Sequence, residues 1–198
     1  MVVIITFCNG KGGAGKTSVT ILLASALSEA GHDVAVLDTD PQGTATRWLT
    51  ATDQRQLLAN GNKQHDALLI DTPPRLDSQE VISSVRRADL VVLVTSPSPA
   101  DLFTSRDTVE LLNREGARKR SRLLFNQVQP GTILSRETEE MADRIGLPAL
   151  KNKLQRRQAY QHAVLTGWRG MPWDAREEVL KTALEITGAA TSKSKVAK

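Results

Sequence analysis

Residues 10–17 read Gly-Lys-Gly-Gly-Ala-Gly-Lys-Thr. This is a complete G-x-x-x-x-G-K-[ST] phosphate loop, and it carries a second lysine, Lys11, directly after its first glycine. An unbroken apolar run, residues 2–7, precedes the loop. Apolar side chains follow it at helical spacing, at Val19, Leu22, Leu23, Ala26, Leu27 and Ala30. The sequence therefore predicts a strand, a glycine-rich turn and a helix, which is the context that a phosphate loop requires.

Each part of the loop has a physical role in holding phosphate. Its glycines let the backbone turn tightly and point amide N–H groups at phosphate oxygens, and the helix that starts near Lys16 adds its positive end. Lys16 would reach the β- and γ-phosphates, and the Thr17 hydroxyl would complete the shell of a bound Mg²⁺. The candidate nucleotide-binding residues are Gly10, Lys11, Gly12, Gly13, Ala14, Gly15, Lys16, Thr17 and Ser18.

The length of the chain suits one hydrophobic core. It has 198 residues, of which 40% are hydrophobic, so we expect a single domain over residues 1–187. Residues 188–198 show no periodicity and end in lysines without an acid, and we expect a disordered basic tail there. The single cysteine, Cys8, excludes a disulfide framework. No stretch approaches the ~20 apolar residues that cross a bilayer, and no targeting segment is visible, so we expect a cytoplasmic protein.

Short apolar runs recur along the chain and alternate with amphipathic segments of helical length. The further runs are residues 34–38, 67–71, 90–94 and 123–126, and the expected helices include residues 99–115, 132–145, 155–166 and 174–187. This alternation predicts an α/β fold, a single-domain P-loop NTPase whose mainly parallel, twisted sheet has helices on both faces. Ligands bind beyond the carboxyl ends of such strands. The segments that meet there carry the phosphate loop, Asp38, Asp40, Asp71 and Asn126.

Three acids at these strand ends are candidates for metal binding and catalysis. Asp71 ends the apolar run Ala-Leu-Leu-Ile, which is the arrangement of a Walker B acid that holds Mg²⁺, often through water. Asp38 and Asp40 lie in a loop stiffened by Pro41. One of them can orient the attacking water while the other supports the metal, and we assign the water to Asp40. Thr17, Asp38, Asp40 and Asp71 are thus the candidate metal ligands; the alternative for each acid is a carboxylate that only caps a turn.

Four motifs together resemble one family. They are Lys-Gly-Gly-Ala-Gly-Lys-Thr at 11–17, Asp-Thr-Asp-Pro-Gln at 38–42, Asp-Thr-Pro-Pro at 71–74 and Thr-Ser-Pro-Ser-Pro-Ala-Asp-Leu at 95–102. The chain is similar over nearly its whole length to the ParA/MinD group of deviant Walker A ATPases. Residues 153–160, Lys-Leu-Gln-Arg-Arg-Gln-Ala-Tyr, also resemble the C-terminal segment of the small plasmid-partition ATPases of the ParF type. Ala14 and Ser18 depart from the usual residues at their positions, and neither change removes a required donor.

The resemblance implies ATP and Mg²⁺ as cofactors and Lys11, Lys16 and Asp40 as catalytic residues. Lys11 is then the signature lysine, which reaches across an ATP-sandwich homodimer to the partner subunit's phosphates. Asp40 activates the hydrolytic water, and Asn126 touches the adenine. A cation supplied in trans suits the charge of a phosphoryl transition state, where it is worth about 10³ to 10⁵ in rate. The alternatives are a solvated loop lysine for Lys11 and a turn-capping amide for Asn126.

Positive charge gathers in the second half of the chain. The net charge is +4, and residues 151–173 contain bases but no acid. This asymmetry favours a polyanion as partner and predicts salt-dependent, sequence-indifferent binding to DNA; the alternative is a set of solvated helix faces. The candidate DNA contacts are Lys151, Lys153, Arg156, Arg157 and Arg169, with Arg118, Lys119, Arg120 and Arg122 as a further group.

These observations favour a DNA-partition ATPase associated with the nucleoid. ATP drives formation of the homodimer, the dimer binds nonspecific DNA, and a centromere-binding partner of ParB or ParG type stimulates hydrolysis and release. The same mechanism with a protein cluster as cargo is the alternative that the sequence does not separate from it.

Two other classes fit the sequence less well. A membrane-site positioner like MinD needs an amphipathic anchor, and residues 188–198 lack the bulky apolar face of one, so we expect no membrane partner. A metabolic enzyme on the same scaffold is disfavoured because Cys8 alone cannot bridge an iron–sulfur cluster and the loop at 38–42 differs from that of the related ligases.

Overall fold

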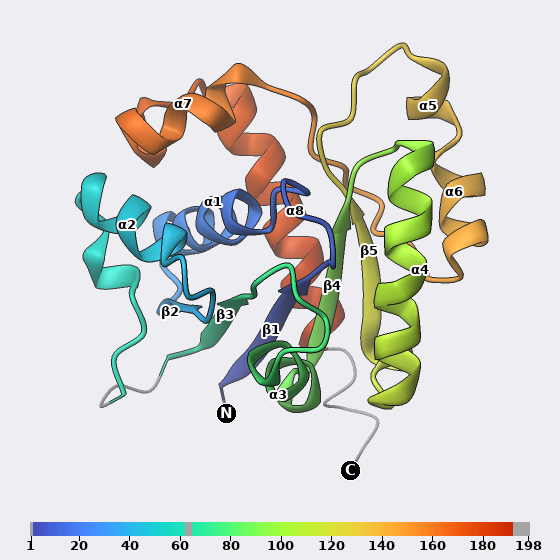
Figure 1. The fold of residues 1–198 in the computed structure, drawn as a ribbon. Coiled ribbons are helices and arrows are strands. Elements are labelled where there is room, and N and C mark those ends of the chain that lie inside the picture. The colour runs from blue at the N-terminus through green and yellow to red at the C-terminus, as the bar shows by residue number, and fades with distance from the viewer. Residues whose placement is uncertain (1, 62–64, 192–198) are drawn as a thin grey trace.

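A parallel sheet forms the centre of the molecule. The computed structural model describes residues 2–61 and 65–191. Within these residues the sheet has five strands, all parallel, in the order β2-β3-β1-β4-β5 (Figure 1). The strands are β1 (Val3–Cys8), β2 (Val34–Asp38), β3 (Ala67–Asp71), β4 (Leu90–Thr95) and β5 (Ser121–Phe125). The predicted fold class is confirmed.

Helices connect the strands and follow the last one. They are α1 (Lys16–Glu29), α2 (Thr44–Ala51), α3 (Gln79–Arg87), α4 (Pro99–Arg114), α5 (Ile133–Arg136), α6 (Thr138–Ile145), α7 (Gln158–Thr166) and α8 (Trp173–Thr191). Short 3₁₀ turns occur at η1 (Arg55–Leu57), η2 (Arg118–Arg120) and η3 (Trp168–Gly170).

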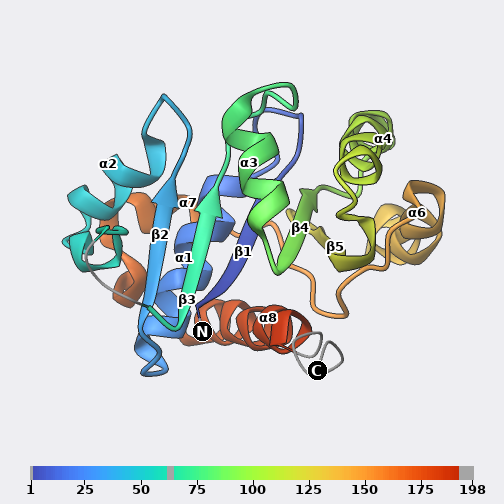
Figure 2. The same cartoon turned by 90° about the horizontal axis from the view of Figure 1, so that it is seen from below.

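Alternate residues of the central strands enter two separate cores. All of β4 is buried: Leu90, Val92 and Val94 join the core under α1 and α8. Val91 and Leu93 join the core under α3, α4 and α6. Figure 2 shows α1 and α8 on one side of the sheet and α3 and α4 on the other. A strand buried on both faces needs apolar residues at every position, which explains why these strands are unbroken apolar runs in the sequence.

Several element ends differ from the predicted ones. Strand β5 ends at Phe125, so Asn126 lies just beyond the strand instead of closing it. The single helix predicted over 132–145 is two helices, because the backbone turns at Glu137 (φ −87°, ψ 7°). The helix predicted from 155 begins at Gln158, because the preceding residues run beside the end of β5, where Leu154 N donates to Phe125 O.

The last helix is longer than predicted. Helix α8 reaches Thr191, and Ala190 is buried in the core under α1 and α8. The prediction of disorder from residue 188 is therefore wrong for residues 188–191. The small side chain of Ala190 packs into this core but gives no periodic signal in the sequence. The rest of the predicted tail, 192–198, lies outside the described residues.

Candidate nucleotide-binding site

The phosphate loop is anchored to the strands on either side of it. Directly after β1, Asn9 Nδ2 donates to Val94 O of β4 at 2.7 Å, and Asn9 Oδ1 accepts from Lys11 N at 2.9 Å. Helix α1 starts after Gly15, which has a left-handed backbone (φ 91°), and no side chain caps the helix. The amides of the first turn of α1 therefore remain available for an anion.

Lys16 is prepared for a negatively charged ligand. Its side chain is buried, and Nζ donates to Asn9 O at 3.1 Å and to Lys11 O at 3.4 Å. Burial lowers the pKa of Lys16, and the nearby carboxylate of Asp71 works in the opposite direction. A buried ammonium held only by carbonyl oxygens gains most from a phosphate beside it.

Asp71 and Thr17 meet as the Walker motifs predict. Thr17 Oγ1 donates to Asp71 Oδ2 at 2.7 Å, although 54 residues separate them. The other oxygen, Asp71 Oδ1, is buried without a hydrogen-bond partner in the described part of the chain. Burial raises the pKa of Asp71 to about 7, with further repulsion from Asp38. A cation bound beside Asp71 Oδ1 would favour the charged form of this carboxyl group.

These residues fit Mg²⁺ and a nucleoside triphosphate. The unpartnered Asp71 Oδ1 and the Thr17 hydroxyl are oxygen ligands of the kind that this cation takes. Residues 2–61 and 65–191 contain no group of three His, Cys, Asp or Glu side chains that could hold a metal ion by itself, so phosphate and water would supply the other ligands. When bound, Mg²⁺ neutralises charge on the β- and γ-phosphates.

Asp38 and Asp40 have different surroundings. Asp38 Oδ2 accepts from Thr46 N at 2.8 Å and from Thr46 Oγ1 at 3.0 Å, and Asp38 Oδ1 accepts from Asp40 N at 3.2 Å. The carboxylate of Asp38 thus holds the first turn of α2. Asp40 Oδ1 accepts from Gln42 N at 2.9 Å, and its Oδ2 has no donor among the described residues. Asp40 is therefore better placed than Asp38 to take a water or a metal-bound ligand.

Lys11 has a partner that the sequence did not indicate. Its ammonium forms an ion pair with Asp101 in the first turn of α4, and the side chains are 41% and 2% exposed respectively. Asp101 Oδ2 also accepts from Ser96 Oγ at 2.6 Å. Asp101 belongs to the motif at 95–102, which was the available signal, but nothing in that motif relates it to a lysine 90 residues away. In this structure Lys11 points toward its own chain.

Asn126 contacts the phosphate loop. Its Nδ2 donates to Ala14 O at 3.0 Å, and a Cβ added to Gly15 would lie 2.2 Å from Asn126 Nδ2. The next residue, Gln127, has a left-handed backbone (φ 58°) and donates from Nε2 to Gly13 O at 3.2 Å. Asn126 therefore clamps the loop, and its contact with adenine stays a prediction.

A small cavity lies beside the phosphate loop. It has a volume of about 70 Å³ and lies between the start of α1 and the segment after β5. The wall of this cavity includes Gly15, Ser18, Asn126, Gln127, Arg156 and Tyr160. No sequence motif indicated Gln127 or Tyr160 as site residues, and Arg156 was predicted to contact DNA.

The predicted DNA contacts fall into two groups. Lys151, Arg156 and Arg169 are exposed. Arg157 is held by Asp174 at 2.5 Å and by Glu178 at 2.9 Å, and Lys153 Nζ donates to Thr138 Oγ1 at 2.5 Å. Internal partners thus hold the side chains of Arg157 and Lys153, and their assignment as DNA contacts stays a prediction.

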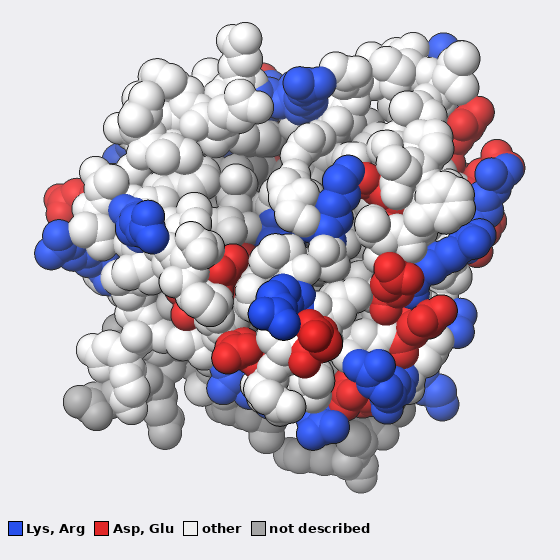
Figure 3. Space-filling model, in the orientation of Figure 1, with Lys and Arg blue, Asp and Glu red and all other residues white. Residues whose placement is uncertain are grey.

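The second basic group is a weaker candidate. Arg118 Nη2 donates to Gly146 O at 2.9 Å, and Arg120 Nη2 donates to Val85 O at 3.2 Å, so both side chains bind the ends of helices. The group precedes or opens β5, at the opposite end of the sheet from the phosphate loop. Figure 3 shows basic and acidic side chains intermixed over one face of the molecule.

Comparisons with known proteins match this geometry. The family model of the CobQ/CobB/MinD/ParA nucleotide binding domain matches residues 5–168. The chain belongs to this family. The predicted recognition is thus confirmed, as is the prediction of an ATPase that uses ATP and Mg²⁺.

Relatives with similar sequences have a specific name in common. Maintenance of carboxysome distribution protein A from Gloeobacter kilaueensis is 32% identical over 193 residues, which cover 88% of each chain. The protein of the same name from Halothiobacillus neapolitanus is 30% identical over 184 residues, covering 82% of this chain and 84% of the relative. A putative plasmid partition protein from Borrelia burgdorferi, solved with AMPPNP, has the same fold, with a TM-score of 0.74 at 14% identity over 98% of this chain and 100% of that one.

The described part of the chain contains no helix that is both long and apolar enough to cross a membrane.

Proposed function

We propose that this protein is a ParA-type ATPase that positions a large protein assembly inside the cell. The observation that carries the proposal is the similarity, over more than four-fifths of the chain, to two proteins named for maintaining carboxysome distribution. The family and the site support the ATPase activity. The two relatives favour a protein cargo over a plasmid.

The cycle follows from the residues of the site. Lys16 and the amides of the loop bind the triphosphate, and Asp40 orients the hydrolytic water. Lys11 leaves Asp101 and reaches the phosphates of a second protomer, which makes the homodimer depend on ATP. Hydrolysis removes the γ-phosphate, which Lys16 of the same protomer and Lys11 of the other protomer both contact. The dimer then separates.

In this cycle the ATP-bound dimer binds to DNA. Lys151, Arg156 and Arg169 are the exposed bases that we assign to nonspecific, nucleoid-associated DNA binding. The partner that stimulates hydrolysis is then an adaptor on the cargo, in the place that a ParB- or ParG-type protein takes in plasmid partition. Arg156 also lines the small cavity beside the phosphate loop, so it lies close to both the nucleotide site and the proposed DNA surface.

Plasmid segregation is the second candidate. A relative named Protein ParA from Rhizobium radiobacter is 26% identical over 126 residues, covering 57% of each chain. Deleting the gene in its host and following both cargoes separates the two functions. A protein cargo predicts clustered or unevenly inherited assemblies with normal plasmid retention. Plasmid loss with normally spaced assemblies would instead establish segregation. A gene that encodes Lys16→Ala should not rescue the deletion strain, whichever cargo is affected, because the variant lacks the phosphate-binding cation.

A further inference from the structure

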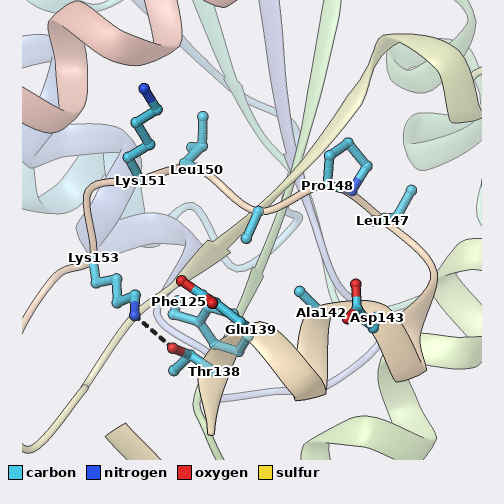
Figure 4. Close-up of a pocket in the computed structure, with 11 residues that line it drawn as sticks. Phe125, Thr138, Glu139, Ala142, Asp143, Leu147, Pro148, Leu150, Lys151 and Lys153 are labelled. Carbon is cyan, nitrogen blue, oxygen red and sulfur yellow. Dashed lines mark hydrogen bonds between the residues drawn. The ribbon is translucent and has the colours of Figure 1, made fainter. Parts of the chain in front are cut away.

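A second hollow lies away from the nucleotide site, at the outer edge of the sheet. It has a volume of about 470 Å³ and runs between α6 and the segment 147–153 (Figure 4). Its apolar lining comes from Phe125 at the end of β5, from Ala142 of α6 and from Leu147 and Leu150. We call this hollow the edge groove.

The edge groove exists because the segment that runs beside β5 bulges away from it between Leu150 and Leu154. Leu150 N donates to Leu123 O at 2.8 Å, and the next contact of this kind is Leu154 N to Phe125 O at 2.9 Å. Between these two hydrogen bonds the outer segment contains two more residues than β5 does. The extra residues are held by Glu185 of α8, whose carboxylate accepts from Lys151 N at 2.7 Å and from Asn152 N at 2.8 Å. This wall of the groove is therefore fixed by α8.

The opposite wall is acidic. Residues 137–143 contain four acids between Arg136 and Arg144, and Glu140 pairs with Arg144 at 2.6 Å. Glu139 and Asp143 line the edge groove, and neither carboxylate has a partner among the described residues. Lys153 bonds to Thr138 at one end of the groove, and the Lys151 side chain points away from the acids (Figure 4). Neither lysine therefore forms an ion pair with Glu139 or Asp143 in the described part of the chain.

We propose that the edge groove docks an extended, cationic segment of a partner protein. Glu139 and Asp143 lie one turn apart on α6, which places them about 6 Å apart along the helix. Two residues of an extended chain span about 6.6–6.8 Å. Basic side chains at alternate positions of a partner segment therefore match the two acids, while its backbone and apolar side chains cover the floor.

The position of the groove favours a partner that affects the nucleotide. Phe125 on the floor directly precedes Asn126, which holds Ala14 O of the phosphate loop. Lys153 on the wall lies three residues before Arg156, which lines the small cavity beside the phosphate loop. A docked segment would thus contact two stretches of chain that each end at the nucleotide site. The docking itself does not depend on the proposed function, and its test uses neither ATP nor DNA.

Fluorescence anisotropy with the full-length protein tests the proposal. The probe is a fluorescein-labelled peptide, Gly-Arg-Leu-Arg-Leu-Arg-Gly, and the comparison peptide has glutamate in place of each arginine. We expect the arginine peptide to bind at low salt and the glutamate peptide not to bind. Glu139→Gln with Asp143→Asn should weaken binding at least tenfold. The matched control, Glu110→Gln with Glu137→Gln, makes the same charge change at two exposed acids outside the groove and should change binding less than twofold.

Several results would overturn the proposal. They are equal weakening by the two double variants, binding of the glutamate peptide, or no binding of the arginine peptide at millimolar concentration. The chain carries its own lysines at 193, 195 and 198, beyond the described residues. If replacing these three by glutamine strengthens peptide binding tenfold, the chain's own end is the occupant, and the proposal of a partner segment fails. Thermal melts of each variant establish that it is folded.

Discussion

Asp38 and Asp40, at the scale of single residues, are neighbouring carboxylates with different surroundings. Asp38 is occupied by Thr46 and by the backbone of Asp40, whereas Asp40 keeps one oxygen without a protein donor in the described residues. We therefore expect Asp40→Asn to bind ATP with unchanged affinity in calorimetry. Its phosphate release should fall at least about 100-fold, which is the usual contribution of a positioned general base.

The comparison variant is Asp38→Asn. It removes the charge from the bonds to Thr46, so it should lower the free energy of unfolding by about 1–2 kcal/mol and reduce phosphate release less than Asp40→Asn does. Normal hydrolysis by Asp40→Asn together with loss of hydrolysis in Asp38→Asn would reverse the two assignments.

Asp71 makes the free energy of unfolding of the nucleotide-free protein depend on pH. Burial raises the pKa of its carboxyl from the ordinary 3.8 to about 7. Between about pH 4 and pH 7 the folded protein keeps this proton while the unfolded chain loses it. The free energy of unfolding therefore falls as pH rises through this window and stays lowered above pH 7. The shift corresponds to at most about 4 kcal/mol, at about 1.4 kcal/mol for each pH unit.

The variant Asp71→Asn removes this contribution and keeps an acceptor for Thr17. In urea unfolding with EDTA and without nucleotide, we expect the variant to be more stable than the natural protein at pH 8 by one to a few kcal/mol, of the order that the pKa shift allows. The two should converge near pH 4. A stability difference that does not change between pH 4 and pH 8 would contradict the buried, protonated state of Asp71.

At the scale of elements, α8 determines the shape of the basic segment 151–157. Glu178 and Glu185 lie two turns apart on α8, and each carboxylate accepts backbone N–H groups of this segment: Glu178 from Gln155 at 2.6 Å and Glu185 from Lys151 at 2.7 Å. Glu178 also binds Arg157 and Tyr160. The helix thereby fixes a segment that has no regular secondary structure of its own.

Removing one of these carboxylates tests this role. Glu185→Ala leaves Lys151 N and Asn152 N without acceptors and should lower the free energy of unfolding by about 1–3 kcal/mol. Hydrogen exchange at residues 151–153 should speed up. The control, Glu177→Ala, removes only a surface pair with Lys181 and should cost less than about 1 kcal/mol. Equal destabilisation by both variants would mean that α8 does not hold the segment.

The elements differ in how well the sequence predicts them. Buried strands such as β4 are predictable because burial on both faces requires an apolar residue at every position. The contact of Thr17 with Asp71 is predictable because two strand-end motifs define it. The ion pair of Lys11 with Asp101 is not, since it depends on how α4 packs against the loop. The end of α8 was missed for a similar reason, because Ala190 is buried by tertiary contact that its small side chain does not signal.

At the scale of the whole molecule, the order of the strands assembles the site. Strand β1 lies between β3 and β4, so the phosphate loop emerges between the strands that end at Asp71 and at Thr95. Helix α4, which follows β4, approaches the loop at two points: Asp101 pairs with Lys11, and Thr108 Oγ1 accepts from Gly10 N at 3.3 Å. The conformation of the loop therefore depends on α4 as well as on the nucleotide.

In the proposed cycle, dimerisation competes with an internal ion pair. Lys11 must leave a carboxylate that is only 2% exposed before it can reach the phosphates of a second protomer. Light scattering with ATP and Mg²⁺ should show Lys11→Ala as a monomer that still binds nucleotide, because the cation that joins the protomers is missing. Asp101→Asn should dimerise at lower protein concentration than the natural chain, because Lys11 is already released, whereas Lys181→Ala should behave like the natural chain. An ATP-dependent dimer of Lys11→Ala would show that another contact joins the protomers. Unchanged dimerisation of Asp101→Asn would show that the internal pair does not oppose it.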